Sequence, residues 1–448
     1  MKNKFKLYFL SLILSLIYIS PIYSTDQFNF DVTEIEIVEE GNKFIGKKRG
    51  LITTDNNIKI EADEFIYDKS LNTLKLIGNI LINDLDKDLK IFSEEAIYYK
   101  NQEIFISKKA SRFIKPDENI KIKANEFVYE KLSNTLKLID NVIIEDLNKN
   151  ATLFSSKAIY YKDKEIFVSE SNSKFVNNEL SISSKMMEYN KMLNSLNANG
   201  NVRIDDKIKN YKLFTEEINY LRNTEHIFTI GKTEAVIGSK YNFKSSDVEL
   251  LRAEDILSSE QKTKIVDKKS KLYEIDEFEY NIKSELLKAK NLFIISDNTV
   301  PSGSSDNLKF SNGFFDLKKD AFVAGQTEIN LQKDSFDNEE NDPRLTGVSS
   351  SSKNQVTTIN KGIFTSCKKR DGKCPPWSIK AKKIIHDKNK KQLIYDHAVL
   401  NVYDKPVMYF PKFFHPDPSV ERQTGFLKPQ LNNSEILGSS LYLPYFYV

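Results

Sequence analysis

The sequence predicts an all-β fold, an elongated antiparallel β-jellyroll built of repeats of about 60 residues. Three observations support this prediction. Segments recur at a nearly fixed spacing, apolar and polar residues alternate along them, and few stretches show helical spacing. Because one such repeat cannot bury its apolar face alone, we expect the repeats to stack into one body with an apolar interior.

The repeats are clearest between residues 58 and 295. IKIEADEFIYDKSLNTLKLIGNILI begins at Ile58, and IKIKANEFVYEKLSNTLKLIDNVII begins at Ile120, 62 residues later. The second half recurs as FSEEAIYYKNQEIFIS from Phe92 and FSSKAIYYKDKEIFVS from Phe154. Weaker copies follow, so the region predicts one repeated β unit.

Turns and loops are predicted where polar residues interrupt the alternation. Short turns are expected at 68–70, 78–79, 100–102 and 163–164. Two stretches rich in Ser, Asn and Asp, 297–313 and 334–354, predict long surface loops. A short helix could form at 248–259, but the neighbouring copies favour strand there.

One face of the predicted strands is apolar. Its clearest members lie in the first two copies: Leu74, Leu76, Ile80, Ile82, Leu136, Leu138, Val142 and Ile144. Such a face packs as an ordinary closed core or lines a groove for the apolar chains of a ligand. Periodicity alone favours the ordinary core.

Residues 1–24 predict a secretory signal peptide. Lys2, Lys4 and Lys6 precede a short apolar run, and a cleavage site follows Ser24. A membrane-spanning anchor is the alternative, but it needs roughly 20 apolar residues. Cleavage would remove three lysines and take the formal charge from +3 to 0 (3 − 3 = 0), which argues against a nucleic-acid partner.

No catalytic or cofactor-binding motif is present. HExxH, GxSxG, phosphate-loop and dinucleotide fingerprints are all missing from the sequence. The four histidines, His226, His386, His397 and His415, stand apart from one another in the sequence. We therefore expect a protein that is not an enzyme and needs no cofactor or metal.

The two cysteines, Cys367 and Cys374, enclose a six-residue segment. A disulfide between them would suit an exported protein and stabilise the fold by about 2–2.5 kcal/mol on the chain-entropy model. Free thiols are one alternative. A zinc site with His386 is another, but it lacks an obvious fourth ligand.

The segment from Thr365 to Val448 carries a series of short motifs. They read C…PPWSIKA…HD, then YFP, PDP, ERQTGFL.P and LPYF. In this order they resemble the LptD (OstA) family of lipopolysaccharide-assembly outer-membrane proteins, at the junction of periplasmic domain and barrel. The resemblance implies a signal peptide at 1–24, a periplasmic OstA-like jellyroll at 25–415 and the start of a transmembrane β-barrel at 416–448. Since the family's barrel is much longer, it also implies a truncated chain, from a fragment or a split gene.

The resemblance further implies lipopolysaccharide transport at the cell outer membrane, with the N-terminal domain in the periplasm. The eight apolar residues would line a lipid groove, and Pro429 and Pro444 would weaken a lateral gate in the barrel. Alternatively, these are edge-strand prolines that discourage aggregation. The implied partners are lipopolysaccharide, an LptA-like jellyroll bridge protein docking near Phe28–Ile37, and an LptE-like plug lipoprotein.

Two other functions remain open at this point. The chain could be a soluble periplasmic lipid-binding β-repeat protein that serves as a bridge or adaptor, or a surface adhesin. The C-terminal segments GFLKP and LYLPYFYV discriminate among these functions, because only a β-barrel needs them as strands.

Overall fold

Strands dominate the structure, a computed structural model. It describes residues 28–447 apart from 117–118, 302–303, 333–340, 370–374, 418–419, 421–423, 427–429 and 435–437. These residues form antiparallel strands with short 3-10 segments at η1 (Glu39–Gly41), η2 (Lys100–Gln102) and η4 (Lys162–Lys164). The all-β prediction is confirmed. Across the described ranges, no helix has the length and apolar character needed to cross a membrane.

The chain divides into two compact units, Met1–Thr152 and Leu153–Val448. The strands of the first unit are β1 (Asn29–Asp31), β2 (Glu34–Val38), β3 (Lys43–Lys47), β4 (Gly50–Thr53), β5 (Ile58–Ala62), β6 (Glu64–Asp68), β7 (Thr73–Asp84), β8 (Leu89–Tyr99), β9 (Ile104–Ser107), β10 (Ser111–Lys115), β11 (Ile120–Ala124), β12 (Glu126–Glu130) and β13 (Thr135–Asp146).

The second unit follows the same plan and then changes to longer strands. Its repeat strands are β14 (Ala151–Tyr161), β15 (Ile166–Ser171), β16 (Ser173–Val176), β17 (Leu180–Ser184), β18 (Met186–Asn190), β19 (Ser195–Asp206), β20 (Tyr211–Leu221), β21 (His226–Ile230), β22 (Lys232–Ile237), β23 (Tyr241–Ser246), β24 (Glu249–Leu251), β25 (Ile256–Ser259), β26 (Thr263–Asp267), β27 (Leu272–Ile275), β28 (Glu277–Asn281) and β29 (Leu286–Ile295). The later strands are β30 (Asn307–Asp316), β31 (Ala321–Asn330), β32 (Asn341–Lys353), β33 (Val356–Cys367), β34 (Trp377–Asp387), β35 (Gln392–Val402), β36 (Lys405–Pro416), β37 (Gly425–Phe426), β38 (Gln430–Ser434), β39 (Gly438–Tyr442) and β40 (Tyr445–Phe446).

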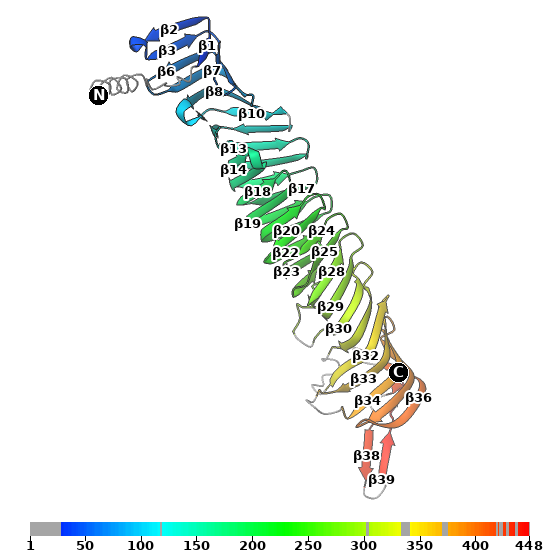
Figure 1. The fold of residues 1–448 in the computed structure, drawn as a ribbon. Coiled ribbons are helices and arrows are strands. Elements are labelled where there is room, and N and C mark those ends of the chain that lie inside the picture. The colour runs from blue at the N-terminus through cyan, green and yellow to red at the C-terminus, as the bar shows by residue number, and fades with distance from the viewer. Residues whose placement is uncertain are drawn as a thin grey trace, which may run out of the picture. The chain divides into compact units, whose positions relative to one another are not determined.

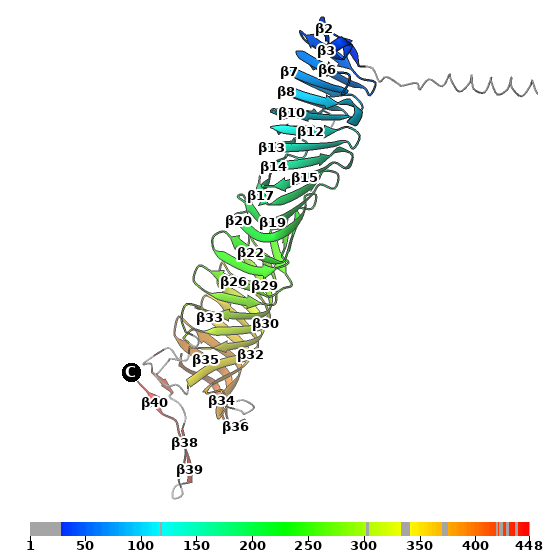
Figure 2. The ribbon, with the colours of Figure 1, turned by 90° about the vertical axis from the view of Figure 1, so that its left-hand side faces the viewer.

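Each unit has two layers that share their long strands. In the first unit, β7 pairs with β6 over its first half and with β5 over its second half. Likewise, β8 pairs with β9 at one end and with β10 at the other. One layer therefore holds β6, β9 and β12, and the other holds β5, β10 and β11. The long strands pass from one layer to the other along a line that we call the corner. Within each unit, Figures 1 and 2 show the strands as successive rungs.

The corner is made by a bulge in the middle of each long strand. In β7 the register with β8 shifts between Ile77 and Ile80, and Gly78 and Asn79 both have positive φ. The prediction of a turn at 78–79 is therefore wrong, because these residues bend one continuous strand. Glycine suits this position, since an added Cβ would also lie 2.8 Å from the Asp63 carboxylate.

The bulge keeps apolar side chains inside both layers. In β8 the buried positions are Leu89, Ile91 and Ser93 before the corner and Ala96 and Tyr98 after it. The inward-facing positions thus change from odd to even numbers at the bulge. Without this one-residue slip, half of the strand would turn its apolar face to solvent.

The predicted long loops are partly strand. The stretch 297–313 contains the first half of β30 from Asn307, and 334–354 contains β32 from Asn341 to Lys353. Serine-rich β32 pairs along its length with β31 and β33. Sheet pairing on both sides thus overrides a composition that is typical of loops. Strand was favoured at 248–259, and β24 and β25 confirm it.

The predicted turns at 68–70, 100–102 and 163–164 lie at or beside strand ends. Asparagine recurs in these turns with positive φ, at Asn72, Asn134 and Asn194. Its short polar side chain tolerates the left-handed region and can bond the next turn, as Asn194 does to Asn223 at 2.7 Å.

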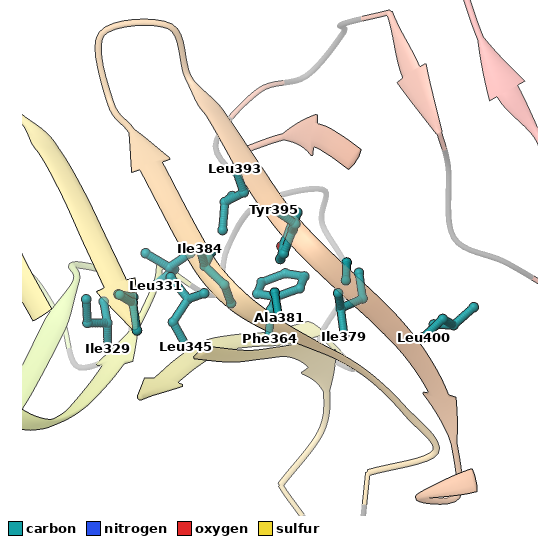
Figure 3. Packing of buried hydrophobic residues seen from close by; sticks show 12 residues of the cluster. Ile329, Leu331, Leu345, Phe364, Ile379, Ala381, Ile384, Leu393, Tyr395 and Leu400 are labelled. Carbon is teal, nitrogen blue, oxygen red and sulfur yellow. The ribbon is translucent and has the colours of Figure 1, made fainter. Parts of the chain in front are cut away.

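The last layers of the second unit enclose a separate apolar cluster. It is built from β31 to β35, with the side chains that Figure 3 shows converging between the strands: Ile329, Leu331, Leu345, Ile359, Phe364, Ile379, Ala381, Ile384, Leu393, Tyr395, Ala398 and Leu400. Trp377 packs against this cluster from its edge. Ile379 and Ala381, two positions apart along β34, both belong to the cluster.

We predict that Leu76→Ala lowers the free energy of unfolding of the first unit by about 2–5 kcal/mol, because it leaves a cavity between the layers. The Leu76 side chain is fully buried. Leu71→Ala, in an exposed turn, is the matched control and should change stability by less than about 0.5 kcal/mol. Denaturant titration of both variants checks this, and equal effects would contradict the two-layer packing.

Candidate functional site: the apolar interior and its two rims

The eight predicted apolar residues all lie inside the first unit. Those on β7 and β13 are at most 2% exposed, and they face the space between the two layers. Side chains from the opposite layers meet there, as Phe113 of β10 and Phe127 of β12 do at 4.9 Å between ring centroids. The structure thus places all eight in the interior between the layers.

Stacked aromatic rings reinforce one layer of this interior. Tyr98 and Phe105 stack at 4.1 Å in the first unit, and Tyr160 and Phe167 stack at 4.0 Å in the second. Each pair joins a long strand to the next short one, and all four rings are buried. The interior surface is therefore broad, apolar and repeated along each unit.

Buried hydroxyl groups line the corner, where the backbone ladder is interrupted. In the first unit Ser93 lies 3.0 Å from both Ser107 and Ser111. In the second unit Thr233 donates to Thr229 at 2.7 Å. These bonds satisfy polar groups that the bulge would otherwise leave without partners. The sequence analysis did not predict these hydroxyl clusters, although Ser93 and Ser155 recur at the repeat spacing and could have indicated them.

A shallow open depression lies on the outer side of the corner in the first unit. It has a volume of about 710 Å³, and its lining includes Leu81, Phe92, Arg112 and Lys123. The Arg112 guanidinium stacks over the Phe92 ring at 4.5 Å. Leu81, Phe92 and Arg112 alternate with buried neighbours along their strands, so this depression belongs to the exterior and not to the interior.

In each unit the turns at the strand ends form two rims, one for each layer. The first rim consists of the turns that follow β6, β8 and β12 in the first unit, and β18, β20, β24, β28, β30, β32 and β34 in the second. The second rim consists of the turns that follow β4 and β7 in the first unit, and β16, β19, β22, β26 and β29 in the second. Backbone bonds link turns along a rim, such as Lys131 N–H to Glu103 C=O at 3.0 Å. The two rims border the mouth of the interior, opposite the corner.

In the first unit a buried lysine bridges the mouth. Lys131, on the first rim, donates to the backbone carbonyl of Asn56 and lies 3.9 Å from both Asp84 and Asp86 on the second rim. The Tyr129 hydroxyl also donates to Asp84 at 2.8 Å. Because the Lys131 side chain is only 8% exposed, its charge depends on these partners.

In the second unit a buried arginine does the same. Arg252, on the first rim, bonds Asp206 at 2.7 Å and Glu179 at 3.0 Å on the second rim. Burial alone would lower the pKa of Arg252, but its hydrogen bonds to Asp206 and Glu179 oppose this, and the pKa lies above its ordinary value. Burial raises the pKa of Tyr211, which therefore stays neutral beside the pair. Breaking such a buried pair on one side costs about 3–5 kcal/mol.

Three further bridges cross the mouth nearer the end of the second unit. Lys240 pairs with Glu285, Lys271 with Asp320 at 3.0 Å, and Lys388 with Asp306 at 2.6 Å. In each pair at least one side chain is well exposed to solvent. Exposed pairs of this kind contribute about 0–1 kcal/mol each. The mouth is thus held firmly at Arg252 and weakly from Lys240 onward.

Two of the sequence motifs meet at the C-terminal end of the second unit. His386 of the HD motif is buried, and its Nε2 is hydrogen-bonded to Asp417 of the PDP motif. Next to this pair, the Tyr395 hydroxyl lies 2.7 Å from His415 Nε2, and His415 Nδ1 lies 2.6 Å from the Pro416 carbonyl. A neutral His415 with its proton on Nδ1 satisfies both contacts. The pair fastens the end of β36 over the apolar cluster.

The remaining predicted sites fall at the edges of the described residues. Cys367 ends β33, but Cys374 lies outside the described residues, so their pairing stays a prediction. The signal peptide at 1–24 lies outside them too. No group of three or more metal-binding side chains occurs within the described parts of the chain.

Pro444 lies between β39 and β40, whereas Pro429 is not among the described residues. The strands around them pair as parts of one hairpin, Gly425 opposite Phe446 and Gln430 opposite Tyr442. β37 and β38 therefore lie beside β40 and β39 in one hairpin.

We predict that stability falls as the pH is lowered from about 6.5 to about 4. Burial lowers the pKa of His415 from 6.5 to about 4, against the opposing effects of the Pro416 carbonyl and Asp417. The unfolded chain therefore binds a proton in this range that the folded chain does not bind, so unfolding is favoured as protons are added. Denaturation midpoints measured across this pH range check it.

His415→Gln should flatten this part of the pH profile. His397→Gln is the matched control, since His397 lies on the exposed face of β35, and it should keep the wild-type profile. A wild-type profile in the His415 variant would contradict the assignment.

Comparisons with known proteins agree with the motifs. A family model described as "Lipopolysaccharide-assembly, LptC-related" matches residues 88–207. LPS-assembly protein LptD of Hahella chejuensis (strain KCTC 2396) is 35% identical over 99 residues, which are 22% of this chain and 12% of that protein. LPS-assembly protein LptD of Idiomarina loihiensis (strain ATCC BAA-735 / DSM 15497 / L2-TR) is 26% identical over 146 residues, 32% of this chain and 19% of that protein. The chain thus spans less than a fifth of the length of these curated relatives.

A solved structure also matches in part. It is LptH of Pseudomonas aeruginosa, described as the LptA homologous periplasmic component of a lipopolysaccharide transport device. The match covers 32% of this chain and 80% of that one at 12% identity, with a TM-score of 0.16.

Proposed function

We infer that this chain works in lipopolysaccharide transport and assembly. The premise is its similarity to LPS-assembly proteins of the LptD type. In this proposal the interior between the two layers receives the acyl chains, and the sugars stay outside the mouth. The observation that carries it is the interior itself: a repeated apolar strip with charged rims along its open side. A soluble bridge or adaptor is not favoured, because the named relatives are LptD proteins.

The chemistry of such transport needs no catalytic residue. Each acyl methylene removed from water gains about 0.8 kcal/mol, so an apolar path binds chains of any length without specific contacts. Side chains fill the interior when no lipid is present, so the two layers must part at the mouth to admit a chain. The corner, with its continuous strands and buried hydroxyl bonds, would act as the hinge.

The cellular location of the chain follows from the same proposal. We place residues 25–415 in the periplasm, after removal of 1–24, and 416–448 at the start of a barrel in the outer membrane. The exposed apolar side chains of the C-terminal hairpin support this: Leu431, Leu441, Tyr442, Tyr445, Phe446 and Tyr447. Such side chains suit a lipid-facing strand with an aromatic girdle. Pro429 and Pro444 would then remove ladder bonds at a lateral gate.

The proposed partners dock at the first strands and inside the barrel. In the described residues β2 pairs only with β3, and its Ile35 and Ile37 are 44% and 58% exposed. An exposed apolar edge strand is suited to pairing with a strand of another chain. An LptA-like jellyroll bridge protein is the proposed partner at Phe28–Ile37. An LptE-like plug lipoprotein is proposed from the family resemblance alone.

A photo-crosslinking amino acid at Phe127 tests the lipid path. Phe127 is fully buried between the layers, so a probe there should crosslink to added lipopolysaccharide. The same probe at Leu132, in an exposed turn that follows the same strand, should not. Gel shift of the crosslinked chain is the readout, and crosslinking from Leu132 alone would contradict the proposal.

The docking edge is tested by adding charge to it. Ile35→Lys/Ile37→Lys should weaken binding of the jellyroll bridge protein by about ten-fold or more, because charged residues on an edge oppose strand pairing. Leu71→Lys, in an exposed turn of the same unit, should bind as the wild-type chain does. Unchanged binding by the double variant would place the partner elsewhere.

A further inference from the structure

A small apolar cavity lies directly beneath one of the exposed bridges of the second unit. It has a volume of about 50 Å³, and its lining includes Tyr273, Ile294, Leu308, Phe315 and Phe322. About 10–15 Å³ suffices for one water, so this space has the size of a few water molecules. Lys271 and Asp320 also line it, which places their ion pair at its outer wall. An apolar space and a charged border thus occur together at this point of the mouth.

The bridge over the cavity is easier to open than the Arg252 bridge. Asp320 is 77% exposed and Lys271 is 24% exposed, whereas Arg252 and Asp206 are 1% and 0% exposed. Opening the Arg252 bridge leaves a buried charge without its partner, but opening the Lys271 bridge leaves two charges that water can solvate. The second unit can therefore part here while Arg252 holds the rims together.

Cations gather around the exposed carboxylate. Partial burial alone would raise the pKa of Asp320, but Lys271, Lys269 and Lys388 outweigh it and lower the pKa. These three lysines come from turns on both rims, after β26 and after β34. Lys388 pairs with Asp306, and among the described residues Lys271 pairs across the mouth with Asp320. Lys269, Lys271 and Lys388 thus lie near the carboxylates of Asp320 and Asp306, which pair with Lys271 and Lys388.

We propose that this point is a port where a phosphorylated lipid passes an acyl chain between interior and solvent. Lys271, Lys269 and Lys388 bind the head-group phosphate, which displaces Asp320 from Lys271. This assignment rests on the proposed function and adds to it the place of passage and the residues that recognise the head group. A phosphate carries up to about two negative charges and three acceptor oxygens, so it competes well with one carboxylate for several lysines.

The port predicts opposite effects for the two sides of the bridge. Asp320→Asn removes the competing carboxylate and should tighten binding of a phosphorylated lipid by about three-fold. Lys269→Glu/Lys271→Glu removes the cations and should weaken it by about ten-fold or more. The probe is lipid A with both phosphates, in detergent micelles, with the full chain. Lipid A after enzymatic removal of its phosphates serves as the second probe, and its binding should not change in either variant.

Matched controls use the same charge changes on the outer face. Glu274→Gln breaks the exposed Lys264–Glu274 pair of 2.7 Å, and Lys262→Glu/Lys264→Glu repeats the double reversal. Both should bind both lipids as the wild-type chain does. Thermal unfolding of every variant establishes that the fold is kept.

The outcomes separate the port from the function on which it rests. If the wild-type chain binds neither lipid, the proposed function fails. If the wild-type chain binds lipid A but Asp320→Asn does not tighten it, or the lysine variant binds normally, the port is wrong and the function stands. If the controls weaken binding as much as the port variants, the effect is general charge attraction and the port is again wrong.

Discussion

The fold depends on one constraint: every long strand must bury one face on both sides of a corner. In β7 the buried positions keep even numbers from Leu74 to Asp84, whereas in β8 they change from odd to even at the corner. The extra residue of β7 at Gly78–Asn79 lets both strands keep their apolar faces inside, and positive φ at Asp140–Asn141 marks the equivalent place in β13. The two-layer interior, the hydroxyl clusters at the corner and the two rims all follow from it.

Much of this could be predicted from the sequence, because burial and alternation are local patterns. The all-β class, the repeats and the inward-facing residues such as Leu76 and Leu138 were predicted and lie where expected. The turn at 78–79 was wrong, because glycine and asparagine mark positive φ and do not distinguish a turn from a bulge. The loop at 334–354 was wrong because pairing on both sides of β32 overrides its serine-rich composition.

The contacts across the mouth could not be predicted in this way. Arg252 and Asp206 are 46 positions apart, and Lys271 and Asp320 are 49 apart, so no local pattern connects them. The same holds for His386 and Asp417, which are 31 positions apart and belong to two different motifs. The motifs identified a family resemblance, but only the fold shows that two of them meet as a buried pair.

The rims give the interior a graded closure. Lys131 in the first unit and Arg252 in the second are buried, and loss of one partner from such a pair is costly. From Lys240 to Lys388 the bridges are exposed and individually weak. A transport path needs both properties, since the two layers must stay together while part of the mouth opens.

The most direct measurement is the distance between the rims with and without lipid. Spin labels at Ser239 and Ser284, after replacement of both native cysteines, would lie in exposed turns on the two rims of the second unit. Double electron–electron resonance then reports the separation in the full chain before and after lipid A is added. The account predicts a longer distance in the lipid-bound chain, because acyl chains must lie between the layers. An unchanged distance with lipid bound would contradict it and place the lipid outside the interior.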